Sequence, residues 1–477
     1  MNSVMPQNVA IKDETKVPLR RVLGLFTATL LVAGNMIGTG VFKKIVPMAS
    51  SGLGEKNILL AWVAAGIITM LGAFTFAGLA QLTTASGGLY EYLRISFGNF
   101  IAYLFGWTIF AIVGSGSVAA VAFIFSQSVN SLVALPNPFQ QWSGVSIAHY
   151  IYPFAFSGVK CFAIITIVLL TWFNYQGVRK SGILNNIVTT AKILGILLLI
   201  LGGILWTGGT GKDVVNNAAI QNHSVSFLTV FFGIMLSAFW AYDGFSNVTA
   251  VTGEIKNPKR NLPIAIVTGV STVILIYVLV NYAYMKVMPA AALGTLGDNK
   301  IAASEIAGII MGNNGKTLVS LLIMLSSFGT LNILILVYSR LYFRMAEEDV
   351  FFKSAAKVHR VYRTPYFALL YSMIWSCMLV ISGTFDVLTN MAVFSAFSFY
   401  TLCAWGLIKM KRKKIINEKI SAYPLAPILF IALTSIFIIN IFISNPLQSI
   451  TGVGLTLVGI PFYYFFKNRY SKISTPP

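Results

Sequence analysis

The stretch LLVAGNMIGTGVF, residues 30–42, places several glycines and polar side chains inside an otherwise apolar segment. Gly38 and Gly40 flank Thr39 near its centre. An apolar run of this kind predicts a membrane-spanning helix, whereas closely spaced glycines predict that the helix is interrupted. Glycines in membrane helices also allow neighbouring helices to approach closely, and for this stretch alone that alternative stays open.

A second interrupted stretch, LSAFWAYDGFSNVTAVTGE, occupies residues 236–254. The pair Asp243–Gly244 lies inside it, and such a pair is typical of a turn rather than a helix. An ionised aspartate at membrane depth costs roughly 3 kcal/mol on insertion scales. We therefore expect Asp243 to face protein or water rather than lipid.

The composition of the whole chain is that of a membrane protein. Of its 477 residues, 56% are hydrophobic and 10% are charged, whereas soluble proteins carry roughly 25% charged residues. The apolar surplus must face lipid, so the sequence predicts an all-α, polytopic membrane protein with about twelve transmembrane helices. The expected spans are 22–49, 58–83, 99–134, 157–176, 181–206, 225–251, 262–288, 316–345, 365–382, 386–408, 425–443 and 449–466.

The net charge of +20 is distributed in short clusters between the apolar runs. Most Lys and Arg residues fall in alternate loops, which assigns those loops and both terminal tails, 1–20 and 467–477, to the cytoplasm. We expect the cluster KMKRKK, 409–414, to contact anionic lipid. This distribution argues against a nucleic-acid partner. Three lysines, counted with the outer loops, run against the bias: Lys43, Lys44 and Lys56.

Enzyme chemistry finds no support in the sequence. The three cysteines, Cys161, Cys377 and Cys403, lie in apolar stretches, and no Cys/His spacing is typical of a metal site. There is no GxSxG or HExxH motif. We expect no catalytic residues, no metal and no cofactor.

The two interruptions occupy corresponding positions in two sets of five spans. The first set covers 21–206 and the second 225–411, and the helices of 425–466 follow. Paired breaks of this kind are typical of a substrate site between inverted repeats. Unwinding frees backbone N–H groups, which suit a carboxylate, and carbonyl groups, which suit an ammonium. The two breaks together predict a site for a zwitterion such as an amino acid.

Lys192 precedes an apolar run, 193–206, that is too short to span a membrane alone. Lys192 must therefore lie within the membrane, either with a specific partner or with its ammonium reaching the interface.

Taken in order, several motifs resemble those of a known family. GNMIGTGVF resembles the first-helix motif of the amino acid–polyamine–organocation superfamily, and the other motifs resemble its L-type amino acid transporter branch, the light-chain-like group. The resemblance runs from about residue 20 to 470. The motifs are GNMIGTGVF (34–42), FWAYDGFSN (239–247), GEIKNPKRNLPIAI (253–266), SSFGTLN (326–332), SRLYFRMAEED (339–349) and the tail 423–466.

The resemblance implies a leucine-transporter-type fold, with a 5+5 inverted repeat and broken helices 1 and 6. It implies that backbone N–H groups of the first break hold the substrate carboxylate, and that carbonyls of both breaks meet the ammonium. The expected substrate-binding residues are Ile37, Gly38, Thr39, Gly40, Val41, Trp240, Ala241, Tyr242 and Asp243.

Three of these residues have expected roles beyond their backbone. Trp240 matches the aromatic position that gates the site in this branch. Tyr242 either orders the unwound turn or only packs. Asp243 departs from the small residue of some branch members, and it either accepts backbone N–H bonds at the break or widens acceptance toward cationic side chains.

The resemblance places Lys192 where an ammonium replaces the sodium ion of sodium-coupled relatives. Its expected contacts are the span-one carbonyls near Gly34 and the hydroxyls of Ser326 or Ser327. The predicted function is sodium-independent transport of neutral L-amino acids by alternating access, most simply as an exchanger. The alternatives are a proton-coupled symporter of the same superfamily and a non-transporting amino acid sensor.

Side-chain specificity is less readable. Ser246, Asn247, Ser398 and Tyr400 are candidate pocket walls that would suit a small or medium neutral side chain.

In animal members of the branch, a cysteine in the loop after span three forms a disulfide bond with a single-pass partner. The corresponding loop here, 131–157, has no cysteine. We therefore expect no disulfide-linked ancillary subunit, and a location in a bacterial inner (plasma) membrane.

Overall fold

The structure is a computed structural model, and all structural statements below concern the part of the chain that it describes. That part is 24–80, 88–147, 151–176, 181–208, 226–245, 255–297, 300–416 and 419–471. These ranges are mainly helical and contain no β-strand, so the all-α prediction is confirmed.

The helices follow one another along the chain. They are α1 (Leu25–Met36), α2 (Gly40–Lys43), α3 (Ile45–Ala49), α4 (Glu55–Leu79), α5 (Gly88–Phe97), α6 (Asn99–Thr108), the π-helix η1 (Ile109–Gly114), α7 (Ser115–Leu132), the short 3₁₀ turn η2 (Gln140–Trp142), α8 (Ser157–Tyr175), α9 (Ser181–Leu205), α10 (Phe227–Tyr242), α11 (Pro258–Val287), α12 (Ala290–Gly294), α13 (Ala302–Glu347), the 3₁₀ turn η5 (Lys353–Ala356), α14 (Tyr366–Ser382), α15 (Phe385–Arg412), α16 (Leu425–Ser444) and α17 (Pro446–Ser471).

In the part of the chain that the structure describes, each predicted span overlaps one helix or a run of consecutive helices. Within the described residues, eight helical segments are long and apolar enough to cross a membrane, and four shorter apolar helices accompany them. The shorter ones lie in α1, α9, α10 and α14. Leu425, Ile439 and Ile443 of α16 are exposed apolar side chains, as expected for a helix that faces lipid. The chain is an integral membrane protein.

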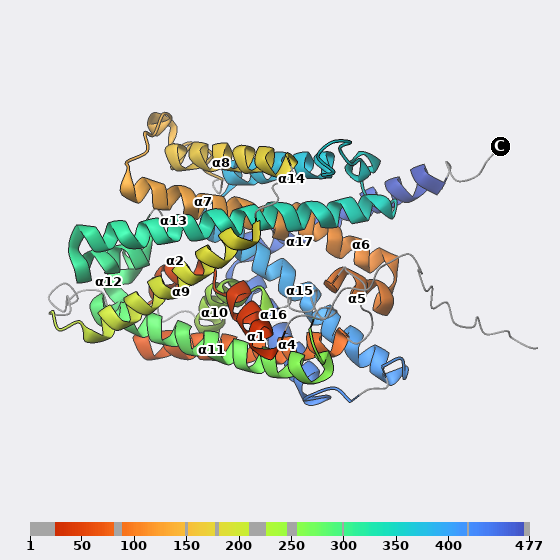
Figure 1. Ribbon diagram of the computed structural model, residues 1–477, viewed down its shortest axis with the longest axis horizontal. Helices are drawn as coiled ribbons and strands as arrows, with labels where there is room; N and C mark the ends of the chain where they lie inside the picture. Colours follow the sequence, from red (N-terminus) through yellow and green to blue (C-terminus); the bar gives the residue numbers. More distant parts are fainter. Residues whose placement is uncertain are drawn as a thin grey trace, which may run out of the picture.

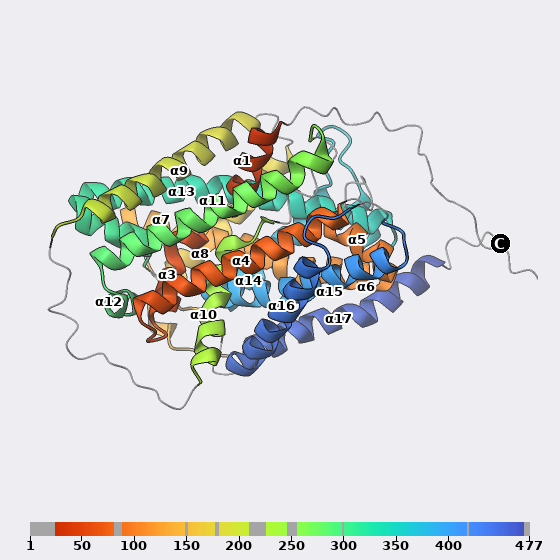
Figure 2. The same cartoon turned by 90° about the horizontal axis from the view of Figure 1, so that it is seen from below.

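The long helices run roughly along one common direction, with the connecting segments at the two ends (Figure 1). The amphipathic helix α5 and the end of α17 lie at one end, and α12 lies at the other, in both views (Figures 1 and 2). Helix α13 packs along α7 and α9, α1 packs against α11, and α10 packs against α4. These contacts place α1 and α10, which carry the two predicted breaks, among long helices.

A short helical section precedes the eighth span. Helix α13 covers Ala302–Glu347, but the backbone leaves the helical region at Gly312, where φ is 66° and ψ is −162°, so the long helix after this break begins close to the predicted boundary of 316. This first section carries Glu305 and other polar residues, so it does not read as a membrane span, yet it buries Ala302 and Ile306 against the bundle. Burial of an amphipathic face, rather than overall hydropathy, forms this helix.

The third span also contains a feature that hydropathy does not reveal. Residues Ile109–Gly114 form a π-helix between α6 and α7. The hydroxyl of Tyr342 in α13 donates to the Ile109 carbonyl at 3.4 Å, and a Cβ at Gly114 would lie 2.7 Å from that hydroxyl oxygen. The glycine therefore allows Tyr342 to approach the widened turn. Such π-bulges are frequent at functional sites.

Two lysines that were counted with the outer loops are instead inside the bundle. Lys43 is 1% exposed and Lys44 is 0% exposed. Both lie at the end of α2, whose four residues continue almost directly into α3. Because α2 packs against other helices at this point, the charges are buried, and they give no information on topology.

Candidate functional site

The first span is broken at the position that its glycines predict. Helix α1 ends at Met36, and the Ile37 N–H still bonds the Ala33 carbonyl at 2.9 Å. Ile37 then has φ −70° and ψ 93°, which leaves the helical region. Helix α2 begins at Gly40 after a non-helical link of three residues, 37–39. The break is therefore between the carbonyl end of α1 and the N–H end of α2.

The described part of the sixth span leaves the helical conformation at Asp243–Gly244. Helix α10 ends at Tyr242, Asp243 has extended backbone angles of −61° and 154°, and Gly244 has φ +102°. This positive φ is accessible to glycine and strained for other residues. The continuation of the sixth span, 246–254, lies outside the described residues, so Ser246 and Asn247 receive no structural account.

The two breaks lie directly against each other. A Cβ at Gly40 would lie 2.7 Å from the Cα of Ala241 and 3.1 Å from Cδ1 of Trp240. A Cβ at Gly244 would lie 2.5 Å from the carbonyl oxygen of Asn35. Glycines at these two positions therefore permit backbone-to-backbone contact between the first and sixth spans. The structure brings together residues that are about 200 positions apart in the sequence, an expectation from the paired-break pattern.

Tyr277 of α11 joins the two breaks, and sequence reasoning missed it. Its hydroxyl lies 2.9 Å from the Met36 carbonyl and 3.0 Å from the Ala241 carbonyl, and it also accepts the Gly38 N–H. The side chain is fully buried. A single hydroxyl thus contacts the carbonyl ends of α1 and α10 and the link between α1 and α2. A tyrosine in an apolar helix carries no signal that would have distinguished it from a packing residue.

Asp243 makes the kind of contact that a break-stabilising carboxylate requires. Its carboxylate accepts the backbone N–H of Gly244, and Tyr400 of α15 donates its hydroxyl to Oδ1 at 3.0 Å. Tyr400, a candidate pocket wall, therefore lies beside the sixth-span break. Ser398, another candidate, bonds the Phe394 carbonyl of its own helix at 2.9 Å.

The two aromatic residues before Asp243 face different neighbours. The Tyr242 hydroxyl donates to the Trp62 carbonyl of α4 at 3.0 Å, and its ring packs against Trp62 and Tyr277. Tyr242 therefore fixes the end of α10 to α4. Trp240 is half-buried and meets the ring of Phe385 in α15 edge-on, with centroids 6.2 Å apart.

Lys192 reaches the broken first helix from α9. Its Nζ lies 3.5 Å from the Ile37 carbonyl and 3.2 Å from Oγ1 of Thr330 in α13. The side chain is 8% exposed. The ammonium therefore lies at the carbonyl end of α1, where the partial negative charge of the helix and its free carbonyls favour a cation.

The partners of Lys192 differ from those expected. The hydroxyl contact is with Thr330, one turn after Ser326 on the same face of α13, and the carbonyl is that of Ile37 rather than one near Gly34. Ser327 donates to Ile323 of its own helix at 2.7 Å, and the buried Ser326 hydroxyl has no hydrogen-bond partner among the described residues. The contact lies one turn further along α13 than the resemblance implies, because Thr330 follows Ser326 by four residues.

Metal chemistry has no evident place here. Among the described residues, no group of three or more His, Cys, Asp or Glu side chains could hold a metal ion. Cys161, Cys377 and Cys403 are free thiols on separate helices. Among the described residues, the polar groups at the breaks are backbone carbonyls and N–H groups, hydroxyls, the carboxylate of Asp243 and the ammonium of Lys192.

A helical membrane protein with two unwound segments in contact, surrounded by buried polar groups, has the architecture of a substrate carrier. Comparison with known proteins agrees. The family model for amino acid permeases matches residues 23–466. The chain is 31% identical to the serine/threonine exchanger SteT of Bacillus subtilis (strain 168), over 94% of this chain and 98% of that protein.

Animal transporters are also similar. The chain is 28% identical to the human b(0,+)-type amino acid transporter 1, over 98% of this chain and 93% of the relative. It is 28% identical to the mouse large neutral amino acids transporter small subunit 2, over 96% of this chain and 83% of the relative. The chain belongs to the amino acid permease family. It is an amino acid transporter and not an enzyme, and the predicted membership of the amino acid–polyamine–organocation superfamily is confirmed.

Proposed function

We propose that this chain exchanges neutral L-amino acids across the plasma membrane by alternating access, without sodium. The observation that carries the proposal is the position of Lys192, whose ammonium lies between the Ile37 carbonyl and the Thr330 hydroxyl. Carbonyls at the end of a broken helix are ligands for sodium in related folds. A fixed ammonium at that end supplies the positive charge and makes a mobile cation unnecessary.

The substrate site of this proposal is formed by the two breaks. Backbone N–H groups of Thr39, Gly40 and Val41 hold the carboxylate, and the carbonyls of Ile37 and Trp240 meet the ammonium. The contact between Gly40 and Ala241 supports this arrangement, because it brings both sets of backbone groups to one place. Gly38 supplies part of the unwound link, and Trp240 covers the site.

The wider architecture of the proposal is a 5+5 repeat. The first repeat is 21–206, the second, inverted repeat is 225–411, and the peripheral helices are in 425–466. Both termini are cytoplasmic, the membrane is a bacterial plasma membrane, and no disulfide-linked subunit is needed. The absence of cysteine from 131–157 and the exchanger among the relatives support these assignments.

The test is uptake of labelled amino acids into sodium-free proteoliposomes, with and without unlabelled amino acid inside. We expect uptake only when internal amino acid is present. Equal uptake into empty vesicles would contradict exchange, and acceleration by an inward proton gradient would establish proton symport instead. Strict dependence on sodium would refute the role given to Lys192. Saturable binding without any uptake would indicate a sensor.

A further inference from the structure

A buried ion pair joins α2 to α15 beyond the proposed substrate site. Lys44 Nζ donates to Asp386 Oδ1 at 2.6 Å and lies 2.5 Å from Oγ1 of Thr389. The Lys44 side chain is 0% exposed and that of Asp386 is 20% exposed. Asp386 and Thr389 lie in the first turns of α15. A charge pair with this geometry is held between two helices rather than on a solvated surface.

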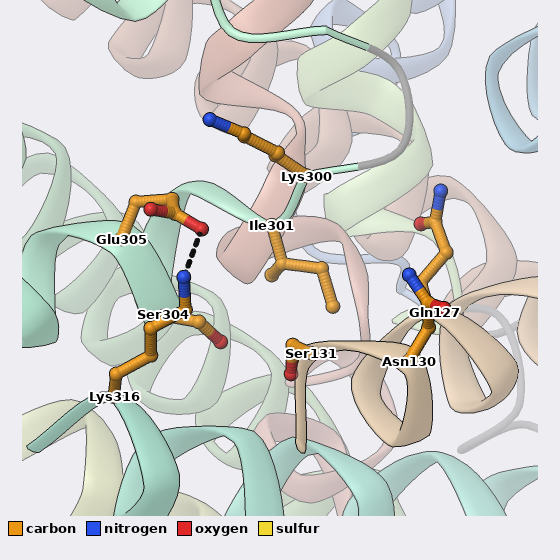
Figure 3. Close-up of a pocket in the computed structure, with 8 residues that line it drawn as sticks. All are labelled: Gln127, Asn130, Ser131, Lys300, Ile301, Ser304, Glu305 and Lys316. Atoms are coloured by element: carbon orange, nitrogen blue, oxygen red, sulfur yellow. Dashed lines mark hydrogen bonds and ion pairs between the residues drawn. The ribbon is translucent and has the colours of Figure 1, made fainter. Parts of the chain in front are cut away.

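The neighbouring lysine extends the contact to a third helix. Lys43 Nζ donates to Oε1 of Gln127 in α7 at 2.8 Å. Gln127 also lines a cavity of about 250 Å³ between α7 and the start of α13 (Figure 3). Glu305 and Lys316 lie at the opposite side of that cavity, 2.8 Å apart. Most residues that line the cavity are polar, and the cavity lies beside the contact between Lys43 and Gln127.

One aromatic ring connects these charges to the sixth span. The Phe385 ring centroid lies 5.2 Å from Lys43 Nζ and 4.9 Å from Lys44 Nζ. The same ring meets Trp240 edge-on at 6.2 Å. Ammonium groups at this distance from a ring are attracted to its face. Separation of α2 from α15 would therefore break the ion pair and also move both lysine ammonium groups away from the ring that contacts Trp240.

We infer that the Lys44–Asp386 ion pair holds the outer end of the substrate path closed, and that it must break when the site opens outward. The inference rests on the proposed alternating-access function, because only that function requires α2 and α15 to separate. Neutralisation of one partner removes the oppositely charged group that is in direct contact with the other in the closed state. In the open state the remaining charge is hydrated, so neutralisation favours opening. Lys44 and Asp386 are positioning residues and need not touch the substrate.

The test measures access to a cysteine placed below the ion pair. Val393 is buried and lies one turn after Thr389 on the same face of α15. In a background with Cys161, Cys377 and Cys403 replaced by serine, Val393→Cys is labelled from outside with a membrane-impermeant thiol reagent. We expect Asp386→Asn and Lys44→Gln each to accelerate labelling at least about tenfold. The exchanged pair Lys44→Glu with Asp386→Lys should return it toward the parent rate.

Lys316→Gln is the matched control, because it neutralises another paired lysine at the same end, within α13 alone. Its labelling rate should equal that of the parent. Thr389→Val serves if Asp386→Asn fails to fold, because it removes only the second acceptor of Lys44. We expect it to accelerate labelling relative to the parent, but by less than about tenfold. Unchanged labelling in the folded variants, or no recovery in the exchanged pair, would overturn the inference. Labelling requires no transport, so failed amino acid exchange alone would count against the proposed function and not against this ion pair.

Discussion

Gly40 lies so close to α10 that no side chain fits between them. Because a Cβ would lie 2.7 Å from the Ala241 Cα, a backbone atom that cannot rotate away, Gly40→Ala must separate the two breaks. We expect exchange by Gly40→Ala to fall at least about tenfold, roughly 1.4 kcal/mol, measured per folded molecule in proteoliposomes. Gly233→Ala in α10 is the control, since no atom lies within 4 Å of its Cβ position. Equal activity of the two variants would show that the close contact is not required.

Lys192 offers a prediction about charge at a single atom. Lys192→Met keeps most of the side-chain volume and removes the ammonium from the Ile37 carbonyl. We expect exchange to fall at least about tenfold, because the carbonyl end of α1 loses its cation. Lys160→Met is the control. Lys160 is also buried and bonds the carbonyls of Tyr152 and Ile381 at 2.7 and 3.0 Å, away from the breaks. If Lys192→Met exchanged amino acids at the parental rate, the proposed basis for sodium independence would be wrong.

Two roles were predicted for Asp243, holding the break and accepting cationic substrates, and one pair of variants distinguishes them. Asp243→Asn retains an oxygen that can accept from Tyr400 or Gly244, whereas Asp243→Gly retains none. If the carboxylate holds the break, leucine exchange should survive in Asp243→Asn and fall in Asp243→Gly. If it accepts cationic substrates, arginine exchange alone should fall in both variants. Unchanged exchange of both amino acids in both variants would exclude both roles.

At the scale of helices, Tyr277 is the contact that ties α1 and α10 to α11. Tyr277→Phe leaves two buried carbonyls, those of Met36 and Ala241, without this donor, and an unsatisfied buried group costs about 1–3 kcal/mol. We expect slower exchange together with lower thermal stability in detergent. Tyr284→Phe is the matched control on the same helix, because the buried Tyr284 hydroxyl has no partner among the described residues. Similar losses in both variants would contradict a specific role for Tyr277.

Some features of the site were predictable from the sequence, and others depend on how the helices pack. The breaks were predictable because glycines and an Asp–Gly pair inside apolar runs are local signals. Tyr277 and Thr330 were not, because their roles arise from contacts between helices that are distant in the chain. The burial of Lys44 was missed for the same reason, since its partner Asp386 is more than 300 residues away. Local chemistry is readable from one sequence, whereas the pairing of side chains across helices requires their packing.

For the whole molecule, the order of the spans predicts on which side of the membrane each loop lies. Seven successive spanning helices or helix pairs separate the loop after α7 from the end of α15, from α8 through α15. An odd number places these two points on opposite sides of the membrane. The clustered lysines and arginines of 409–414 predict that the second point lies in the cytoplasm.

Single cysteines test this arrangement directly in the cysteine-free background. Val145 and Ile415 are both exposed, one in the loop after α7 and the other just beyond α15. We expect Val145→Cys to react with an impermeant thiol reagent in intact cells, and Ile415→Cys to react only after permeabilisation. Labelling of both from outside would mean that one helix between them does not cross the membrane. In that case the two breaks would not belong to inverted halves, and an inverted repeat could not explain why the two breaks form one site.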